Sequence, residues 1–200
     1  MSPPSEVPSP IAAPTSEYSQ VERTLLLQLA HRAIEHGLKG SKLDLSPPNS
    51  HLAEKRGAFT TLHLRGRLRG CIGYVIPTHS LYRTVAETAQ AAAFDDPRFS
   101  AVTEEEALHL MIEISVLSPM KPIRPEEVVV GRHGLLVAKG NHRGVLLPQV
   151  PVEWGWDRET FLAQTCHKAG LPLDAWRQDA DLQGFTAEIF RDSEAATEAR

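Results

Sequence analysis

Helical and alternating patterns of apolar residues predict a series of elements in the first half of the chain. Apolar residues recur at three- and four-residue steps after Ser19, so we expect a helix that this serine caps and that ends near Gly37. Alternation on both sides of Arg65-Gly66 indicates a tight turn between two antiparallel strands. The predicted elements are that first helix, strands over residues 58–64 and 67–75, a helix from Thr78 or Ser80 to residue 94, a short helix opened by Thr103, and a strand over residues 111–117.

The second half of the chain repeats the order of hairpin, helix and strand. Prolines at positions 119, 122 and 125 first impose an extended connection. Strands are then predicted over residues 135–139 and 143–147, around a Gly140-Asn141 turn. A helix from Asp157 to residue 169 follows, and the chain closes with a strand in which Phe185, Ala187 and Ile189 alternate.

The two hairpins share a short sequence signature. Arg69-Gly70 and Arg143-Gly144 each enter the return strand of a hairpin that precedes a helix. We interpret this signature as an internal duplication, which makes Cys71 and Val145 equivalent. Chance similarity is the alternative, because hairpins followed by helices are common.

Composition separates a body from two terminal segments. The first fourteen residues contain five prolines with serines between them, which is typical of a disordered tail and lacks the basic and apolar regions of a secretory signal. The segment after residue 191 is polar and alanine-rich, and we expect it to fray. The predicted organisation is a disordered tail over residues 1–17, one domain over residues 18–191 and a frayed tail over residues 192–200.

The overall composition is that of an ordinary globular domain. Hydrophobic residues make up 42% and charged residues 23% of the 200-residue chain, which excludes a mainly disordered chain, a collagen or a coiled coil. The formal charge of −4 gives no global attraction for nucleic acid, so Arg65, Arg67, Arg69 and Arg83 are better interpreted as a solvated basic turn than as a nucleic-acid contact. No apolar run is long enough to span a membrane. Without an export signal, we expect a cytoplasmic protein with reduced thiols.

The densest candidate for chemistry is the return strand of the first hairpin, Leu68-Arg69-Gly70-Cys71-Ile72-Gly73. Residues two apart on a regular strand share a face, so Arg67, Arg69 and Cys71 are expected to point the same way while the apolar residues between them face the core. Two guanidinium groups beside the thiol would stabilise the thiolate, with Arg69 as the nearer one.

The two glycines of this segment would leave room beside the thiol. Gly70 and Gly73 carry no side chain, so a ligand or another backbone could approach closely there. We therefore assign Gly70, Gly73 and Arg67 to ligand binding and Cys71 to catalysis. A cysteine packed as a small apolar residue is the alternative, and a glycine-linked β-bulge would reverse the strand parity.

Three polar residues of the second half are further candidates. His133 lies between two glycines at a strand entrance and is a candidate acid or base, although turn histidines are common. Glu153 is a candidate general base and Gln149 a candidate binding residue, with a solvated surface role as the alternative for the glutamate. Cys166 lies on the apolar stripe of its helix, where core packing is expected.

Motifs for metals and common cofactors are missing from the sequence. The nine histidines include no HExxH frame and the chain has no CxxC pair, so we predict no metal site. The P-loop, the dinucleotide fingerprint and the serine-hydrolase motif are also missing, so the sequence indicates no particular cofactor.

Seven ordered motifs resemble the AMMECR family, whose bacterial and archaeal branch is called AmmeMemoRadiSam system protein A, and the similarity covers about residues 20–190. The motifs are GAFTTL from position 57, LRGCIG from 68, DPRF from 96, ISVLSP from 114, HGL from 133, LLPQV from 146 and CHKAGL from 166. The resemblance implies an α+β fold built from two repeats around antiparallel sheet, with a larger and a smaller lobe and a cleft between them. It also implies that residues 68–73 are the functional centre.

The resemblance implies partners but no reaction. Genes of this kind resemble members of a set that includes a Memo-like protein, related to extradiol dioxygenases, and a radical SAM protein. One hypothesis is an enzyme component that uses the Cys71 thiolate, with Arg69 stabilising charge and His133 or Glu153 as acid or base. The other is a non-catalytic binding or scaffold module that recognises a partner protein or a product of that system. Either would hold a small-molecule or peptide ligand in the cleft.

Overall fold

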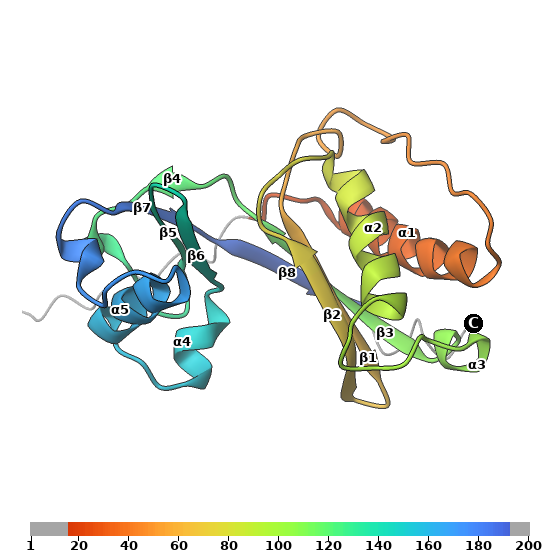
Figure 1. The fold of residues 1–200 in the computed structure, drawn as a ribbon. Coiled ribbons are helices and arrows are strands. Elements are labelled where there is room, and N and C mark those ends of the chain that lie inside the picture. The colour runs from red at the N-terminus through yellow and green to blue at the C-terminus, as the bar shows by residue number, and fades with distance from the viewer. Residues whose placement is uncertain (1–15, 193–200) are drawn as a thin grey trace, which may run out of the picture.

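The computed structural model describes residues 16–192 as two lobes joined by extended chain (Figure 1). The helices are α1 (Gln20–Leu38), α2 (Leu81–Phe94), α3 (Glu104–Ala107), α4 (Gln149–Glu153) and α5 (Arg158–Lys168), with 3-10 turns at Pro125–Glu127 and Ala175–Arg177. The strands are β1 (Ala58–Leu64), β2 (Arg67–Tyr74), β3 (Leu110–Leu117), β4 (Lys121–Pro122), β5 (Gly134–Lys139), β6 (His142–Leu146), β7 (Asp181–Phe185) and β8 (Ala187–Arg191).

The large lobe is an antiparallel sheet covered on one face by two helices. Its strand order is β2-β1-β3-β8, and α2 packs across β1 and β2 while α1 packs on α2 and β3 (Figure 1). Alternate residues of the central strands, such as Leu62, Ile112 and Ile114, are fully buried under these helices. The period-2 pattern therefore buries one face of the sheet and leaves the other without a helical cover.

The small lobe is a second antiparallel sheet, of order β4-β7-β5-β6, against which α5 packs. Its core contains Leu135, Phe161 and Leu162, and Cys166 is fully buried beside Val137. Core packing of Cys166 is thus confirmed. Burial also raises the pKa of this thiol, so it is a poor nucleophile where it stands.

The two sheets have the same connectivity, and this confirms the predicted α+β fold of two repeats. In each lobe a hairpin is followed by a helix and by a strand that returns beside the first hairpin strand. The fourth strands are exchanged: β4 follows β3 but joins the small sheet, and β8 follows β7 but joins the large one.

The shared Arg-Gly signature has a packing cause. A Cβ atom at Gly70 would lie 2.1 Å from the carbonyl oxygen of Ala92 in α2, and one at Gly144 would lie 2.4 Å from the nitrogen of Ala169 at the end of α5. Each glycine therefore lets a helix backbone touch a strand. Cys71 and Val145 each follow that glycine on an edge strand, so they occupy equivalent positions.

The expected closing strand is in fact two strands. Phe185 ends β7 in the small sheet, Thr186 lies between the strands, and β8 belongs to the large sheet. Phe185 and Phe190 are buried in the two lobes, while Ile189 is 53% exposed, so the alternation does not continue across Thr186. The strands β4 and β7 and the helix α4 were not predicted from the sequence.

Contacts at both ends of the described chain connect the region of α1 with strands β8 and β3. The backbone nitrogen of Glu17 donates to Glu188 over 2.7 Å. At the other end Asp192 accepts from the backbone of Ile112 over 2.9 Å and lies 2.7 Å from the His31 ring. The remainder of the predicted tails, residues 1–15 and 193–200, lies outside the described residues. Within residues 16–192, no helix has the length and apolar character needed to cross a membrane.

Candidate functional site

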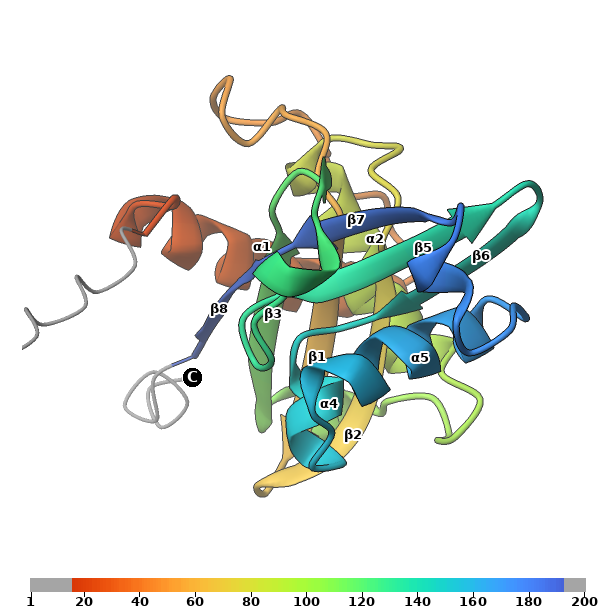
Figure 2. The same ribbon diagram turned by 90° about the vertical axis from the view of Figure 1, so that its left-hand side faces the viewer.

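The sheet face of the large lobe opposite α1 and α2 carries the thiol and is here called the interlobe face. The small lobe stands in front of this face (Figures 1 and 2). The strand register places on it Phe59, Thr61 and His63 of β1, Leu68, Cys71 and Gly73 of β2, Met111, Glu113 and Ser115 of β3, and Ile189 and Arg191 of β8.

Cys71 is half-buried on this face, and neighbouring groups hold both its side chain and its backbone. The Thr61 hydroxyl donates a hydrogen bond to the Cys71 sulfur over 3.3 Å. The Cys71 amide donates to Asp96 Oδ2 over 2.9 Å, and its carbonyl accepts from Arg98 over 3.5 Å. Because β2 is an edge strand, its outward backbone groups need such partners, and the loop after α2 supplies them.

A β-bulge sets the direction of the residues around the thiol. Gly70 pairs with Leu62 and Leu68 pairs with His63, so Arg69 is the extra residue of β2. The expectation that Arg67, Arg69 and Cys71 share one face is therefore wrong, because a bulge reverses the parity of the strand. Leu68 shares the interlobe face with Cys71, whereas Arg67 lies opposite Leu64 at the exposed end of the hairpin.

Arg69 is a structural ion-pair partner in this fold. Its guanidinium binds both carboxylate oxygens of Glu106, at 3.0 and 2.9 Å, and donates to the carbonyls of Ser100 and Ala101. This network attaches the segment before α3 to the hairpin, and it holds the pKa of Glu106 below its ordinary value. The charge of Arg69 is compensated by Glu106 rather than directed at the thiol.

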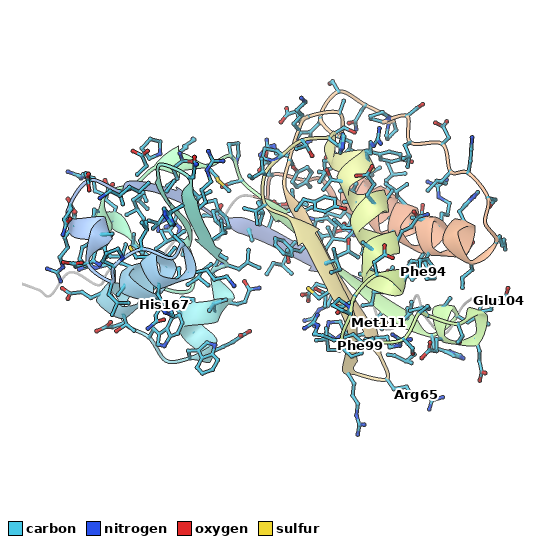
Figure 3. The ribbon with its side chains drawn as sticks, in the orientation of Figure 1. Arg65, Phe94, Phe99, Glu104, Met111 and His167 are labelled. Atoms are coloured by element: carbon cyan, nitrogen blue, oxygen red, sulfur yellow. The ribbon has the colours of Figure 1, made fainter. Side chains whose placement is uncertain are left out.

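Asp96 links the thiol strand to Arg98. Asp96 is 4% exposed, and its carboxylate accepts from the Arg98 backbone and guanidinium as well as from the Cys71 amide. These bonds, led by those from the Arg98 side chain, hold the pKa of Asp96 far below its ordinary value. The centre of the Phe99 ring, which is labelled in Figure 3, is 5.4 Å from the guanidinium carbon of Arg98 and 5.9 Å from that of Arg69. Arg98 is thus the cation fixed next to Cys71.

A row of polar side chains crosses the interlobe face at the level of the thiol. In register, Cys71 is opposite Thr61, Thr61 is opposite Glu113, and Glu113 is opposite Arg191. Among residues 16–192 the Glu113 carboxylate has no ion pair. The equivalent row of the small lobe is Val145, Leu136, Gln183 and Pro122.

The two rows differ in chemistry, because the row of the large lobe is polar along its whole length. Only there do a thiol, a hydroxyl, a carboxylate and a guanidinium follow one another across the strands. Thr61, Glu113 and Arg191 were missed by the sequence analysis. The alternation of Glu113 with Ile112 and Ile114 was the available signal, because it places the carboxylate on the face away from the core.

The predicted glycines have packing roles. Gly70 is occupied by the close approach of α2, so no ligand reaches it. At Gly73 an added Cβ would lie 2.2 Å from the Phe59 ring, which covers this glycine on the interlobe face. The room that the two glycines make is therefore used by the protein itself.

The second-half candidates line pockets that Cys71 does not reach. Gln149 and Glu153 are exposed on α4 and line a pocket of about 250 Å³ that includes Ile189 of β8. Ile189 lies three strands from β2, roughly 14 Å at about 4.8 Å per strand, so Glu153 is not beside the thiol. His133 lines a different pocket of about 320 Å³ with Lys121 of β4. Its Nδ1 accepts from the Val129 backbone, and burial lowers its pKa.

One group of possible metal ligands occurs in the described chain, at Glu17, His51 and Glu54. Arg56 already contacts both carboxylates, at 2.6 Å and 2.7 Å. A guanidinium in this position neutralises the charge that a metal ion would need, so the group is better explained as an ion-pair network that holds the chain before α1.

Sequence and structure comparisons agree on the family. The AMMECR1 family model matches residues 27–190. The chain belongs to the AMMECR1 family. Protein PYRAB00100 of Pyrococcus abyssi is 47% identical over 182 residues, which cover 84% of this chain and 88% of the relative. A protein of Methanothermobacter thermautotrophicus is 43% identical over 185 residues, with 87% and 96% coverage.

A solved crystal structure has the same fold. The crystal structure of the uncharacterized protein PH0010 from Pyrococcus horikoshii matches with a TM-score of 0.72 at 46% identity, covering 84% of this chain and 90% of that one. The AMMECR1 match includes the thiol strand, the Asp96 loop and both hairpins. It extends over both lobes and includes Thr61, Cys71 and Glu113, whereas Arg191 lies one residue beyond it.

Proposed function

We propose that this AMMECR1-family protein acts through the Cys71 thiol on the interlobe face, as a nucleophile or thiol carrier in an enzymatic step. The observation that carries the proposal is the row of Cys71, Thr61, Glu113 and Arg191, which the other repeat lacks. Active-site cysteines are partly exposed and lie near cations and hydrogen-bond donors. Cys71 has both, in Arg98 and Thr61, whereas Cys166 is buried.

The side chains around the thiol have distinct chemical roles in this proposal. The Thr61 hydroxyl, which donates to the sulfur, stabilises the thiolate. When the sulfur adds to an electrophilic carbonyl carbon of a ligand, the S–C bond forms and the carbonyl oxygen takes the π electrons, where Arg98, the cation next to Cys71, stabilises the charge. The thiol proton passes through water to the Glu113 carboxylate, which lies two strands from Cys71, roughly 10 Å at about 4.8 Å per strand.

The biological setting of the proposal rests on the family resemblance. We place the protein in a system with a Memo-like protein and a radical SAM protein, one of which supplies or consumes the ligand held at Cys71. The ligand is a small molecule or a peptide between the lobes. We propose a cytoplasmic location, in keeping with reactive and reduced thiols.

The test is the intact mass of the protein purified from cells that also produce the Memo-like and radical SAM proteins. We expect an added mass that peptide mapping assigns to Cys71, that disappears in Cys71→Ser and that persists in Cys166→Ser. The second variant is a matched control because it removes the only other thiol. An added mass that Cys71→Ser leaves unchanged, or unmodified Cys71 in every preparation, would contradict the proposal.

A non-catalytic binding module is the second candidate function, and the 250 Å³ pocket between α4 and β8 favours it. In that case the interlobe face recognises a partner protein or a product of the system without forming a bond to sulfur. Cys71→Ser would then keep full activity in cells, whereas changes to the pocket would abolish it. Comparing Cys71→Ser with a substitution in the pocket therefore separates the thiol-dependent enzyme from the binding module.

A further inference from the structure

The pocket between the lobes combines apolar walls with three polar side chains. Its walls come from Gly131, Arg132, Pro148, Gln149, Val152, Glu153, Ala187 and Ile189. Two of the apolar residues are unusually open for their type, since Val152 is 59% exposed and Ile189 is 53% exposed. They come from different lobes, so an apolar group bound here contacts both (Figure 1).

The polar residues are held by the short helix α4 and the turn before β5. Gln149, Val152 and Glu153 are spaced i, i+3 and i+4, so they share one side of α4. Gly131 has a φ of +81°, and a Cβ there would lie 3.1 Å from the Val152 side chain. The left-handed turn at Gly131 thus brings Arg132 to the same pocket as Glu153.

The two charges of this pocket have no ion-pair partner among residues 16–192. Neither Arg132 nor Glu153 forms an ion pair with a residue of the described chain, although they have opposite signs and line the same small cavity. In contrast, Arg56, Arg69 and Arg98 each have a carboxylate partner. One cation, one anion and an amide next to an apolar wall therefore remain available for a ligand.

We propose that this pocket binds a free α-amino acid with an aliphatic side chain. Its carboxylate binds Arg132, its ammonium group binds Glu153, Gln149 hydrogen-bonds either end, and the side chain packs between Val152 and Ile189. The proposal is separate from the chemistry of Cys71, because the thiol does not line the pocket.

Size and charge favour a small zwitterion over other common ligands. A volume of about 250 Å³ is below the range of roughly 300–1,000 Å³ that drug-sized ligands and cofactors occupy. A phosphate or other multivalent anion would meet the Glu153 carboxylate, and a metal ion would meet the Arg132 guanidinium. A zwitterion satisfies both charges at once, which a singly charged molecule does not.

The experiment is titration calorimetry of the full chain with leucine, leucinamide and N-acetyl-leucine. Leucinamide lacks the carboxylate and N-acetyl-leucine lacks the ammonium group. We expect the unchanged protein to bind leucine about tenfold more tightly than either analogue, as expected for one lost charged hydrogen bond. In Arg132→Met, leucine should no longer bind more tightly than leucinamide, but it should still bind more tightly than N-acetyl-leucine. In Glu153→Gln, leucine should no longer bind more tightly than N-acetyl-leucine, but it should still bind more tightly than leucinamide.

Matched controls keep the test independent of folding and of the thiol. Arg143→Met and Glu105→Gln remove the same charges from exposed positions outside the pocket and should bind leucine normally. Cys71→Ser should also bind normally, so failure of the thiol proposal would leave this one standing. Ile189→Ala should reduce the preference for leucine over glycine.

Three results would overturn the proposal. They are the absence of saturable leucine binding at millimolar concentrations, selectivity that Arg132→Met and Glu153→Gln leave unchanged, and tighter binding of a peptide with both termini blocked. The last would indicate a protein partner in place of a free amino acid.

Discussion

Removing the Asp96 carboxylate tests how the thiol strand is held. In Asp96→Ala the Cys71 amide loses its acceptor and Arg98 loses its ion-pair partner. A hydrogen bond to a charged group contributes about 1.5–3 kcal/mol, and the carboxylate accepts from two residues. Because the Arg98 side chain is 55% exposed and regains water, the expected loss of unfolding free energy is only about 2–3 kcal/mol.

Thermal and chemical unfolding measure this loss. A change of about 2–3 kcal/mol lowers the Tm of a domain of this size by roughly 5–10 °C. The neighbouring Asp95 is exposed and is not bonded to Cys71, so Asp95→Ala should change the stability by less than about 0.5 kcal/mol. Equal effects of the two variants would refute the reasoning.

The pH dependence gives an independent check of the same contact. The pKa of Asp96 is lowered in the folded protein from an ordinary value of 3.8, so its stabilisation is present above that value and is lost as the pH falls through the lower folded-state value. The difference in stability between the unchanged protein and Asp96→Ala should therefore be constant from about pH 5 to 8 and shrink only below about pH 4. A difference that disappears near neutral pH would exclude the ion pair as its source.

Three further predictions concern the same lobe. Gly70→Ala should destabilise the protein by about 3 kcal/mol or more in urea unfolding, because its Cβ would lie 2.1 Å from the Ala92 carbonyl oxygen in a packed helix. Arg69→Met should cost about 2–4 kcal/mol but leave the alkylation rate of Cys71 within about twofold, since this guanidinium serves a structural network. A large drop in that rate would restore Arg69 as a partner of the thiol. Thr61→Val, which keeps the shape and removes the donor to sulfur, should slow alkylation of Cys71 several-fold without lowering the Tm by more than a few degrees.

The local pattern of the sequence predicts most elements because their signals are contained within each segment. Ser19 and Asp157 cap helices as expected, and Arg65-Gly66 forms the turn between β1 and β2 at residues with positive φ. The Arg-Gly signature at Gly70 and Gly144 also predicts the repeat. The caps and the turn depend on residues that are close in the sequence, and the repeat is visible because the same short motif occurs twice.

The missed features depend on contacts between distant segments. Arg69 breaks the alternation of β2 because its guanidinium binds Glu106, 37 positions away, and two loop carbonyls. The break at Thr186 follows from the exchange of β8 into the other sheet. Helix α4 has only five residues and contains Pro151, so its pattern is too short to indicate a helix. The polar row can be recognised only from the register of four strands, and no single segment contains that information.

Alkylation of the native protein with iodoacetamide, followed by peptide mapping over time, tests the placement of the reactive thiol most directly. Cys71 is half-buried on the interlobe face, and Cys166 is fully buried with a raised pKa. We predict that Cys71 is modified first and that Cys166 reacts only when the small lobe unfolds. Equal rates for the two thiols, or earlier modification of Cys166, would contradict it.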